Sequence, residues 1–321
     1  MLCRLTLFTP VSLMFLRPIH IIPPDTNIDF VAKRWFAFSV TIILVLITIA
    51  ALFIKGLNLG IDFKGGILIE AKAPQAVDIA ALRSDLLALN LGEIELQQFG
   101  SPDDVLIRIQ RQEGDEAAQM TAIQSVRDKL GTQYEYRRVE VVGPTVGKEL
   151  LHAGILATVL AMLAISVYVG VRFEWQFGLA ALIATFHDVF TTVGLYSVLH
   201  LDFNLTAVAA LLTLAGYSIN DTVVVFDRIR ETLRRQKATD LRAIINASVN
   251  QTLSRTTMTA GTTLLALLPL VFMGGQTLIN FSAALTWGIF VGTYSSIYVA
   301  AALLLYMPPL RRMDIVKKPE A

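Results

Sequence analysis

Charge and cysteine are both scarce in this sequence, and their scarcity excludes several classes of protein. Only 17% of the residues are charged and 54% are hydrophobic, a balance typical of a polytopic membrane protein and foreign to a soluble domain. The single cysteine, Cys3, excludes an internal disulfide framework and a cysteine-based metal cluster. The histidines are scattered without HExxH or similar spacing, so they do not indicate a metal site. No GxxxxGK(S/T) loop occurs, so nothing indicates nucleotide hydrolysis. No nucleophile–base pattern is visible either, so we predict no metal, no cofactor and no enzymatic activity.

Six apolar segments are each long enough to cross a bilayer as a helix, which takes about 20 residues. The first is preceded by Lys33 and Arg34 and begins at Trp35, residue types that anchor a helix at the membrane interface. Gly288 and Gly292 in the last segment form a GxxxG pair, which favours close helix packing. The predicted spans cover residues 35–54, 153–171, 177–199, 205–226, 256–272 and 278–307.

The distribution of Lys and Arg among the connections predicts the orientation of the spans. These residues are concentrated in the connection 227–255 and in the tail 308–321, whereas the turns 200–204 and 273–277 contain none. Short cytoplasmic connections carry the excess of Lys and Arg in membrane proteins. We therefore predict that both termini and the first of these connections are cytoplasmic, and that residues 55–149 lie outside.

The cytoplasmic segments show no clear signal for function. The arm 1–34 begins with a short apolar run that Pro10 interrupts, and we predict that it is retained and not cleaved as a signal peptide. Residues 227–237 alternate in charge, which favours a solvated helix over a nucleic-acid or lipid head-group site.

The segment 55–149 has the pattern of a small α+β domain. Strand-like runs follow glycine or turn residues, and the helical runs are apolar on one face. Their order, βαββαβ, predicts a split-βαβ, ferredoxin-like unit with both helices on one face of an antiparallel sheet. The other face would be free for a partner. The predicted elements are strands at 65–71, 93–99, 105–110 and 134–142, helices at 79–89 and 117–130, and a turn at 100–104.

Asp221 and Asn220 lie side by side inside the apolar segment 205–226. An ionised carboxylate at membrane depth costs at least a few kcal/mol unless it is paired, hydrated or protonated. Asp221 is therefore a candidate functional residue. The alternative is an interhelical hydrogen bond that only holds helices together.

Two further spans contribute polar groups that could reach a similar depth. His187 and Asp188 lie inside the segment 177–199, and Arg255 stands at the start of the fifth span. An arginine near an aspartate favours the charged carboxylate, whereas removal from water favours the neutral one. If Arg255 approaches and withdraws, Asp221 can load and release a proton, because arginine itself stays charged. The alternatives are a static ion pair, an Arg255 side chain that reaches the interface, and a His187–Asp188 couple that only bridges helices.

A set of motifs stands at fixed places relative to the predicted spans: GIDFKGG at 60–66, VGPTVG at 142–147, FHDV at 186–189, GYSINDT at 216–222 followed by DRIRE at 227–231, and LSRT at 253–256. With this combination, and with the topology over about residues 28–312, the chain resembles the SecF family. SecF proteins are the smaller subunits of the SecD–SecF complex of bacterial protein export, within the RND superfamily. SecD is similar in plan but has a much larger outer region, so the short outer domain here favours SecF.

The resemblance implies a function and a set of partners. With SecD, such a protein uses the proton motive force to promote release of preproteins from the SecYEG channel on the periplasmic side of the bacterial inner membrane. The residues matching Asp221 and Arg255 are linked to proton movement in the family. RND proteins have twelve spans in two similar halves, so the resemblance implies that SecD completes the bundle and that Asp221 faces the junction.

Two other functions share part of this pattern. Half of an RND-type exporter of lipid or another small amphiphile would carry the same proton relay, but normally with a larger outer domain. A non-transporting scaffold that docks other export subunits would need the outer domain and not Asp221.

Overall fold

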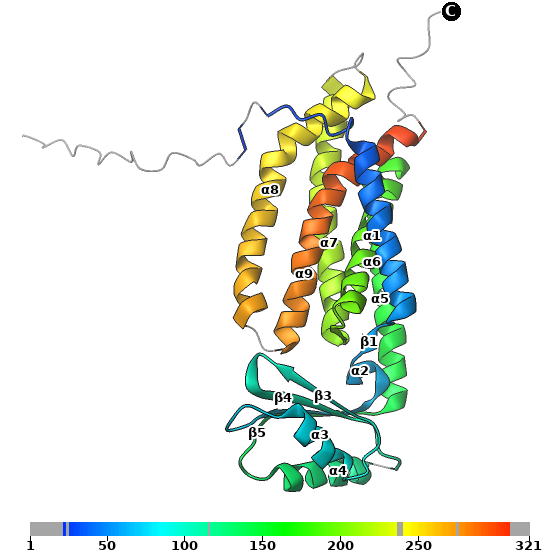
Figure 1. The fold of residues 1–321 in the computed structure, drawn as a ribbon. Helices are drawn as coiled ribbons and strands as arrows, with labels where there is room; N and C mark the ends of the chain where they lie inside the picture. Colours follow the sequence, from blue (N-terminus) through cyan, green and yellow to red (C-terminus); the bar gives the residue numbers. More distant parts are fainter. Residues whose placement is uncertain (1–21, 24–25, 115, 236–239, 274–275, 309–321) are drawn as a thin grey trace, which may run out of the picture.

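The computed structural model describes residues 22–23, 26–114, 116–235, 240–273 and 276–308. They form a bundle of long helices with a small sheet domain at one end (Figure 1). Within this part of the chain six helices are long and apolar enough to cross a membrane, which confirms the six predicted spans. Their bounds are α1 Arg34–Ile54, α5 Pro144–Arg172, α6 Trp175–Val198, α7 Leu205–Arg235, α8 Leu241–Met273 and α9 Gln276–Tyr294, the last extended by a π-helix (Ser295–Ala300), α10 (Ala301–Leu303) and a 3-10 turn (Leu304–Tyr306).

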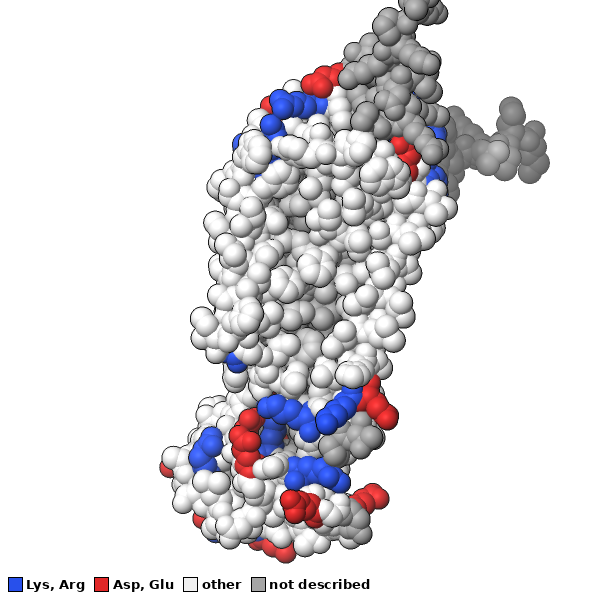
Figure 2. Space-filling view, turned by 90° about the vertical axis from the view of Figure 1, so that its right-hand side faces the viewer, with Lys and Arg blue, Asp and Glu red and all other residues white. Residues whose placement is uncertain are grey.

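The surface of the bundle is that of a protein embedded in lipid. On the face shown in Figure 2, Lys, Arg, Asp and Glu gather at the two ends, and the long middle stretch between them is free of these charged residues. Outward-facing side chains include large hydrophobic ones such as Phe36 and Phe53 on α1 and Tyr168 on α5. Such exposure would be a liability in water, whereas it costs nothing against lipid tails. The protein is therefore a multi-pass membrane protein.

The sheet domain has the predicted α+β fold. Its four strands are antiparallel, in the order β3-β4-β2-β5, and α3 and α4 cover the face that points away from the bundle (Figure 1). Apolar side chains from the sheet, such as Ile67 and Ile107, meet Leu86 of α3 and Val126 of α4 in one core. The bounds are β2 Gly66–Lys72, α3 Ile79–Leu87, β3 Ile94–Phe99, β4 Ser101–Ile109, α4 Glu116–Leu130 and β5 Glu135–Val142.

The predicted turn at 100–104 is too long. β4 begins at Ser101, so Gly100 alone, at a φ of 67°, reverses the chain. The carbonyl oxygens of Pro102 and Asp103 accept hydrogen bonds from Val77 and Ala73, at 2.9 and 2.8 Å. These contacts with the segment after β2 hold the turn-like residues in an extended conformation.

Nearly all of the described part of the connection 227–255 is helical, including residues 227–235 of the helix predicted at 227–237. α7 continues to Arg235 and α8 begins at Leu241; residues 236–239 lie outside the described part of the chain. Apolar residues continue at helical spacing beyond the predicted spans, and Ile229, Ile244 and Ile245 are fully buried in one core. Burial of this apolar face stabilises the helical hairpin.

The segment before α1 docks against this hairpin. Asn246 and Asn250 on α8 hydrogen-bond the backbone of Val31 and Ile28, at 2.8 to 3.0 Å. Hydrogen bonds from the Ala32 N–H and the Asn246 side chain hold the pKa of Asp29 below its usual value. Residues 1–21 of the predicted arm, and residues 309–321 of the tail, lie outside the described part of the chain.

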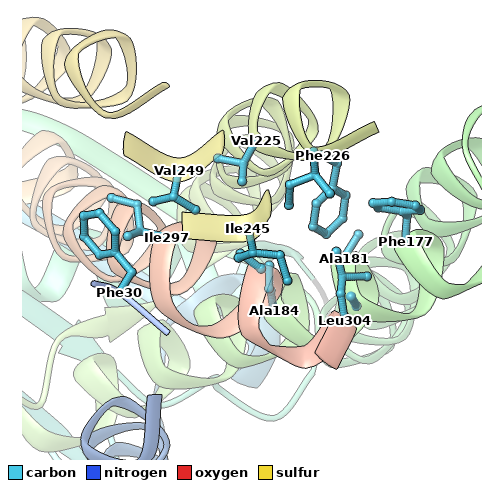
Figure 3. Packing of buried hydrophobic residues seen from close by; sticks show 14 of the residues in the cluster. Phe30, Phe177, Ala181, Ala184, Val225, Phe226, Ile245, Val249, Ile297 and Leu304 are labelled. Carbon is cyan, nitrogen blue, oxygen red and sulfur yellow. The ribbon is translucent and has the colours of Figure 1, made fainter. Parts of the chain in front are cut away.

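Two apolar clusters fill the interior of the bundle. The first lies at the end away from the sheet domain and joins Phe177 and Ala184 of α6 to Phe226 of α7 and to Ile297, as Figure 3 shows from close by. The second lies nearer the sheet domain and is built around Tyr196 on α6, together with the α7 stretch from Ala207 to Ala215 and apolar residues of α9. The two clusters leave a band between them on every central helix.

Candidate functional site

The band between the two apolar clusters is occupied by polar side chains from three helices and the π-helix. We call it the polar layer. On α7, for example, the cluster near the sheet domain ends at Ala215 and the other begins at Val225. All members of the layer are at least 96% buried: His187 and Asp188 on α6, Ser218, Asp221 and Thr222 on α7, Thr256 on α8, and Ser295 and Ser296 in the π-helix.

Asp188 is fully enclosed, and both oxygens of its carboxylate have hydrogen-bond partners. Its Oδ2 accepts hydrogen bonds from Ser218 at 2.6 Å and from Ser295 at 2.7 Å, while its Oδ1 lies 2.9 Å from Nδ1 of His187. One carboxylate thus joins α6, α7 and the π-helix. This is the pattern of a buried polar group whose partners offset its removal from water.

The π-helix explains how two consecutive serines reach two different partners. Ser295 donates to Asp188, and Ser296 lies 2.8 Å from the hydroxyl of Thr222 on α7. An α-helix turns about 100° per residue, whereas the wider π-turn changes this spacing. Two adjacent hydroxyls can therefore both bind into the layer. Short π-helices are frequent at functional sites.

Asp221 is buried in the same layer in a different way. Its side chain is 3% exposed, yet its Oδ2 has no hydrogen-bond partner among the described residues. On the neighbouring α8, the buried Oγ1 of Thr256 also lacks a partner within that part of the chain. A buried acceptor without a donor is costly and is therefore rare in a structural role.

Arg255 lies beside the layer, but its side chain is exposed on the outside of the bundle. Among the described residues no ion pair within 4.0 Å joins Arg255 to Asp221. The two residues thus lie on neighbouring helices, α8 and α7, without a closed pair. Thr259, one turn after Arg255 on α8, binds within its own helix, because its hydroxyl donates to the Arg255 carbonyl at 2.9 Å.

Asn220 is not part of the layer. It is exposed on α7, turned away from its buried neighbour Asp221. The structure thus brings together Asp188, His187 and Asp221 at one level, with Arg255 beside them and Asn220 outside.

Sequence reasoning missed Ser295, Ser296 and Thr256 as members of the layer. Two adjacent serines inside an apolar span were the available signal for the first two. Thr256 had none, because a threonine at the start of a span is common. No group of three or more His, Cys, Asp or Glu side chains that could hold a metal occurs among the described residues.

Glycines let the helices around the layer approach closely. A Cβ on Gly288 would lie 2.4 Å from Leu214 of α7, and one on Gly292 would lie 3.3 Å from Ser218 and 3.4 Å from Asp188 Oδ2. The predicted GxxxG pair therefore packs α9 against α7, with Gly292 at the polar layer and Gly288 against the apolar cluster nearer the sheet domain.

Comparison with known proteins places this architecture in a family. The C-terminal model of the protein export membrane proteins SecD/SecF matches residues 122–309, and the SecD/SecF GG motif matches residues 50–77. The chain is 45% identical over 293 residues to a protein translocase subunit SecF of Rickettsia prowazekii, covering 91% of this chain and 94% of the relative. It is 42% identical over 304 residues to that of Rhodobacter capsulatus, covering 90% and 91%.

The fold also matches solved structures. It superimposes on SecDF of Thermus thermophilus, a translocon-associated membrane protein, with a TM-score of 0.80 and 36% identity over 89% of this chain. A structure of SecDF in a super-membrane-facing form gives a TM-score of 0.64 at 36% identity over 88% of this chain. In both cases the chain spans only 39% of the SecDF chain. From the matched motifs, the near full-length relatives and the shared fold, we conclude that the chain belongs to the SecF family of protein translocase subunits.

Proposed function

We propose that this protein, together with SecD, uses the proton motive force to promote movement and release of preproteins through the SecYEG channel on the periplasmic side of the bacterial inner membrane. The observation that carries the proposal is the buried Asp221, whose Oδ2 has no partner among the described residues. A gradient of protons is then the energy source, and no cofactor is required. Both termini would be cytoplasmic and the sheet domain periplasmic, in line with the Lys and Arg distribution.

Proton transfer would alternate between two states of Asp221. In one state the carboxyl is neutral, which suits a buried group without a donor. In the other the guanidinium of Arg255 moves closer and favours the ionised carboxylate, so that the proton leaves. The hydrogen-bonded Asp188, with His187, would hold α6 and α7 in register while this happens.

A second subunit is part of the proposal. The described part of the chain provides six spans, and the chain matches 39% of the SecDF chain. Arg255 and Asn220 are exposed at the depth of the polar layer, which is unfavourable against lipid and favours burial against another protein. We propose that SecD covers this side of α7 and α8, with SecYEG and preproteins as the further partners.

Export of a secreted reporter tests the proposal in cells that lack the native protein. We expect that Asp221→Asn lowers the export rate at least tenfold and that Arg255→Ala lowers it as well, with normal membrane abundance and SecD association. Asp227→Asn is the matched control, because Asp227 lies on the same helix and is exposed. If Asp221→Asn exports like the wild type, the proton relay is wrong and the scaffold function is favoured.

The alternative proton-driven function is that this protein forms half of an exporter of lipid or another small amphiphile. Within the described residues, the sheet domain has a main core covered by two helices and a small second cluster, Ile61, Leu68 and Leu106, on the other face of the sheet. The same complementation separates the two functions, because an amphiphile exporter would leave reporter secretion unchanged in the deletion strain.

A further inference from the structure

The sheet domain is tied to the bundle by two short strands that are far apart in the sequence. β1 (Asn58–Leu59) follows α1, β6 (Asp202–Phe203) precedes α7, and they pair in parallel. The Gly60 N–H extends the pairing with a 2.8 Å hydrogen bond to the Phe203 carbonyl. Strands of two residues are too short to fix the angle between two bodies.

A neighbouring contact fixes the first turn of α7. The helix α2 (Ile61–Lys64) carries Asp62, whose Oδ2 accepts a 2.8 Å hydrogen bond from the N–H of Leu205, the first residue of α7. The first N–H groups of a helix have no partner inside the helix, so this carboxylate caps α7 from another segment. α2 is itself pressed against α5, where a Cβ on Gly147 would lie 2.7 Å from the Phe63 carbonyl.

An ion pair reaches from the middle of the sheet into this junction. Arg108 stands on the inner strand β4, and its guanidinium pairs with the carboxylate of Asp202 on β6. Asp202 Oδ1 also accepts a 2.8 Å hydrogen bond from the side-chain amide of Asn58 on β1. The side chains of Arg108 and Asp202 are only 11% and 6% exposed. Glu95, the second partner of Arg108 at 3.4 Å, is 48% exposed.

We propose that Arg108, Asp202 and Asn58 form a clamp that fixes the sheet domain to the start of α7, so that the domain moves with this helix as one body. The loss of one partner from a buried ion pair leaves an uncompensated charge, which makes the clamped orientation strongly preferred. Glu95 contributes little, because exposed pairs are weak. Asp202 is a positioning residue here, since it acts through Arg108 on the whole domain.

The clamp also gives the polar layer a mechanical path to the sheet domain. Leu205 and Asp221 are on the same helix, about 24 Å apart along its axis at 1.5 Å per residue. A rotation or shift of α7 at the polar layer therefore reaches the clamp directly. The proposal concerns the orientation of the domain and does not require that Asp221 carries protons.

Spin-label distances in the full chain, reconstituted in lipid nanodiscs, test the clamp. Labels are placed at Ser84→Cys on α3 and Leu278→Cys on α9, both exposed, in a Cys3→Ser background. We expect one narrow distance distribution for the otherwise unchanged chain and for Glu95→Gln. Asp202→Asn and Arg108→Gln should each at least double the width of the distribution, and Asn58→Ala should widen it less.

Two outcomes would overturn the clamp. One is a distribution of wild-type width in both Asp202→Asn and Arg108→Gln; the other is equal widening in the Glu95→Gln control. Asp202→Asn is nearly isosteric and keeps an acceptor for Asn58, so it provides a folded variant even if Arg108→Gln does not fold. Because the readout is a distance and not export, failure of the clamp is distinguishable from failure of the proton relay.

Discussion

Asp188 and Asp221 are buried in the same polar layer, but their surroundings differ. Asp188 is held on both oxygens, by Ser218, Ser295 and His187. Asp221 is buried to a similar degree, and its Oδ2 has no partner in the described part of the chain. Burial alone is therefore a poor guide to the role of a carboxylate inside a membrane bundle.

The difference in hydrogen bonding suggests different roles for the two aspartates. A satisfied carboxylate stabilises the helices that donate to it, and the donors lose their partner when it is removed. An unsatisfied one raises the free energy of the folded state, so its presence requires another reason. We therefore propose that Asp188 stabilises the layer and that Asp221 carries its chemistry.

The largest expected effect on stability comes from removing the satisfied carboxylate. Asp188→Leu leaves the hydroxyls of Ser218 and Ser295 buried without their acceptor, which should lower the free energy of unfolding by about 3 kcal/mol. Thermal unfolding in detergent should show a fall in Tm of about 5 °C or more. An unchanged Tm would contradict the structural role of Asp188.

The matched substitution at Asp221 should not lower stability as Asp188→Leu does. Asp221→Leu removes a buried carboxylate that has no described donor at Oδ2, so the free energy of unfolding should stay within about 1 kcal/mol of the wild type or rise. The same unfolding measurement checks this. A loss as large as that of Asp188→Leu would show that Asp221 has a structural partner.

A smaller effect is expected where one hydrogen bond to Asp188 is removed. Ser295→Ala should cost about 1 kcal/mol, since Ser218 and His187 still hold the carboxylate. Ser282→Ala on α9 is the control, because the Ser282 hydroxyl donates to carbonyl groups of its own helix. Equal losses in the two variants would argue against a special role for the π-helix serine.

Two glycines near the aspartates give effects of opposite sign. A methyl group on Gly292 would press on Ser218 and on Asp188 Oδ2, so Gly292→Ala should cost about 1 kcal/mol. Gly216 has no atom within 4 Å of an added Cβ, and Gly216→Ala should instead stabilise the helix by about 0.5 kcal/mol. Unfolding of the chain without its partner provides the measurement, and a reversed order would contradict the packing around Asp188.

Much of the fold was predictable because its signals are local. A run of about 20 apolar residues specifies a span whatever its neighbours, and the alternation of patterns between 65 and 142 specifies strands and helices in order. Asp221 was predictable for the same reason, since a charge in an apolar run is visible without any contact. The extent of the helical hairpin at 227–255 was not, because its charged residues concealed an apolar face that only packing reveals.

The remaining features depend on contacts between distant parts of the chain. β1 and β6 have two residues each and are strands only because they meet. The serine pair reaches the polar layer only because the last span contains a π-turn against α7. The sequence alone determined which charges enter the membrane. Tertiary structure decided which of these charged groups have hydrogen-bond partners. A hydrogen bond needs its partner at a given distance and on a given side of the helix, and the apolar pattern of the sequence encodes neither the distance nor the side.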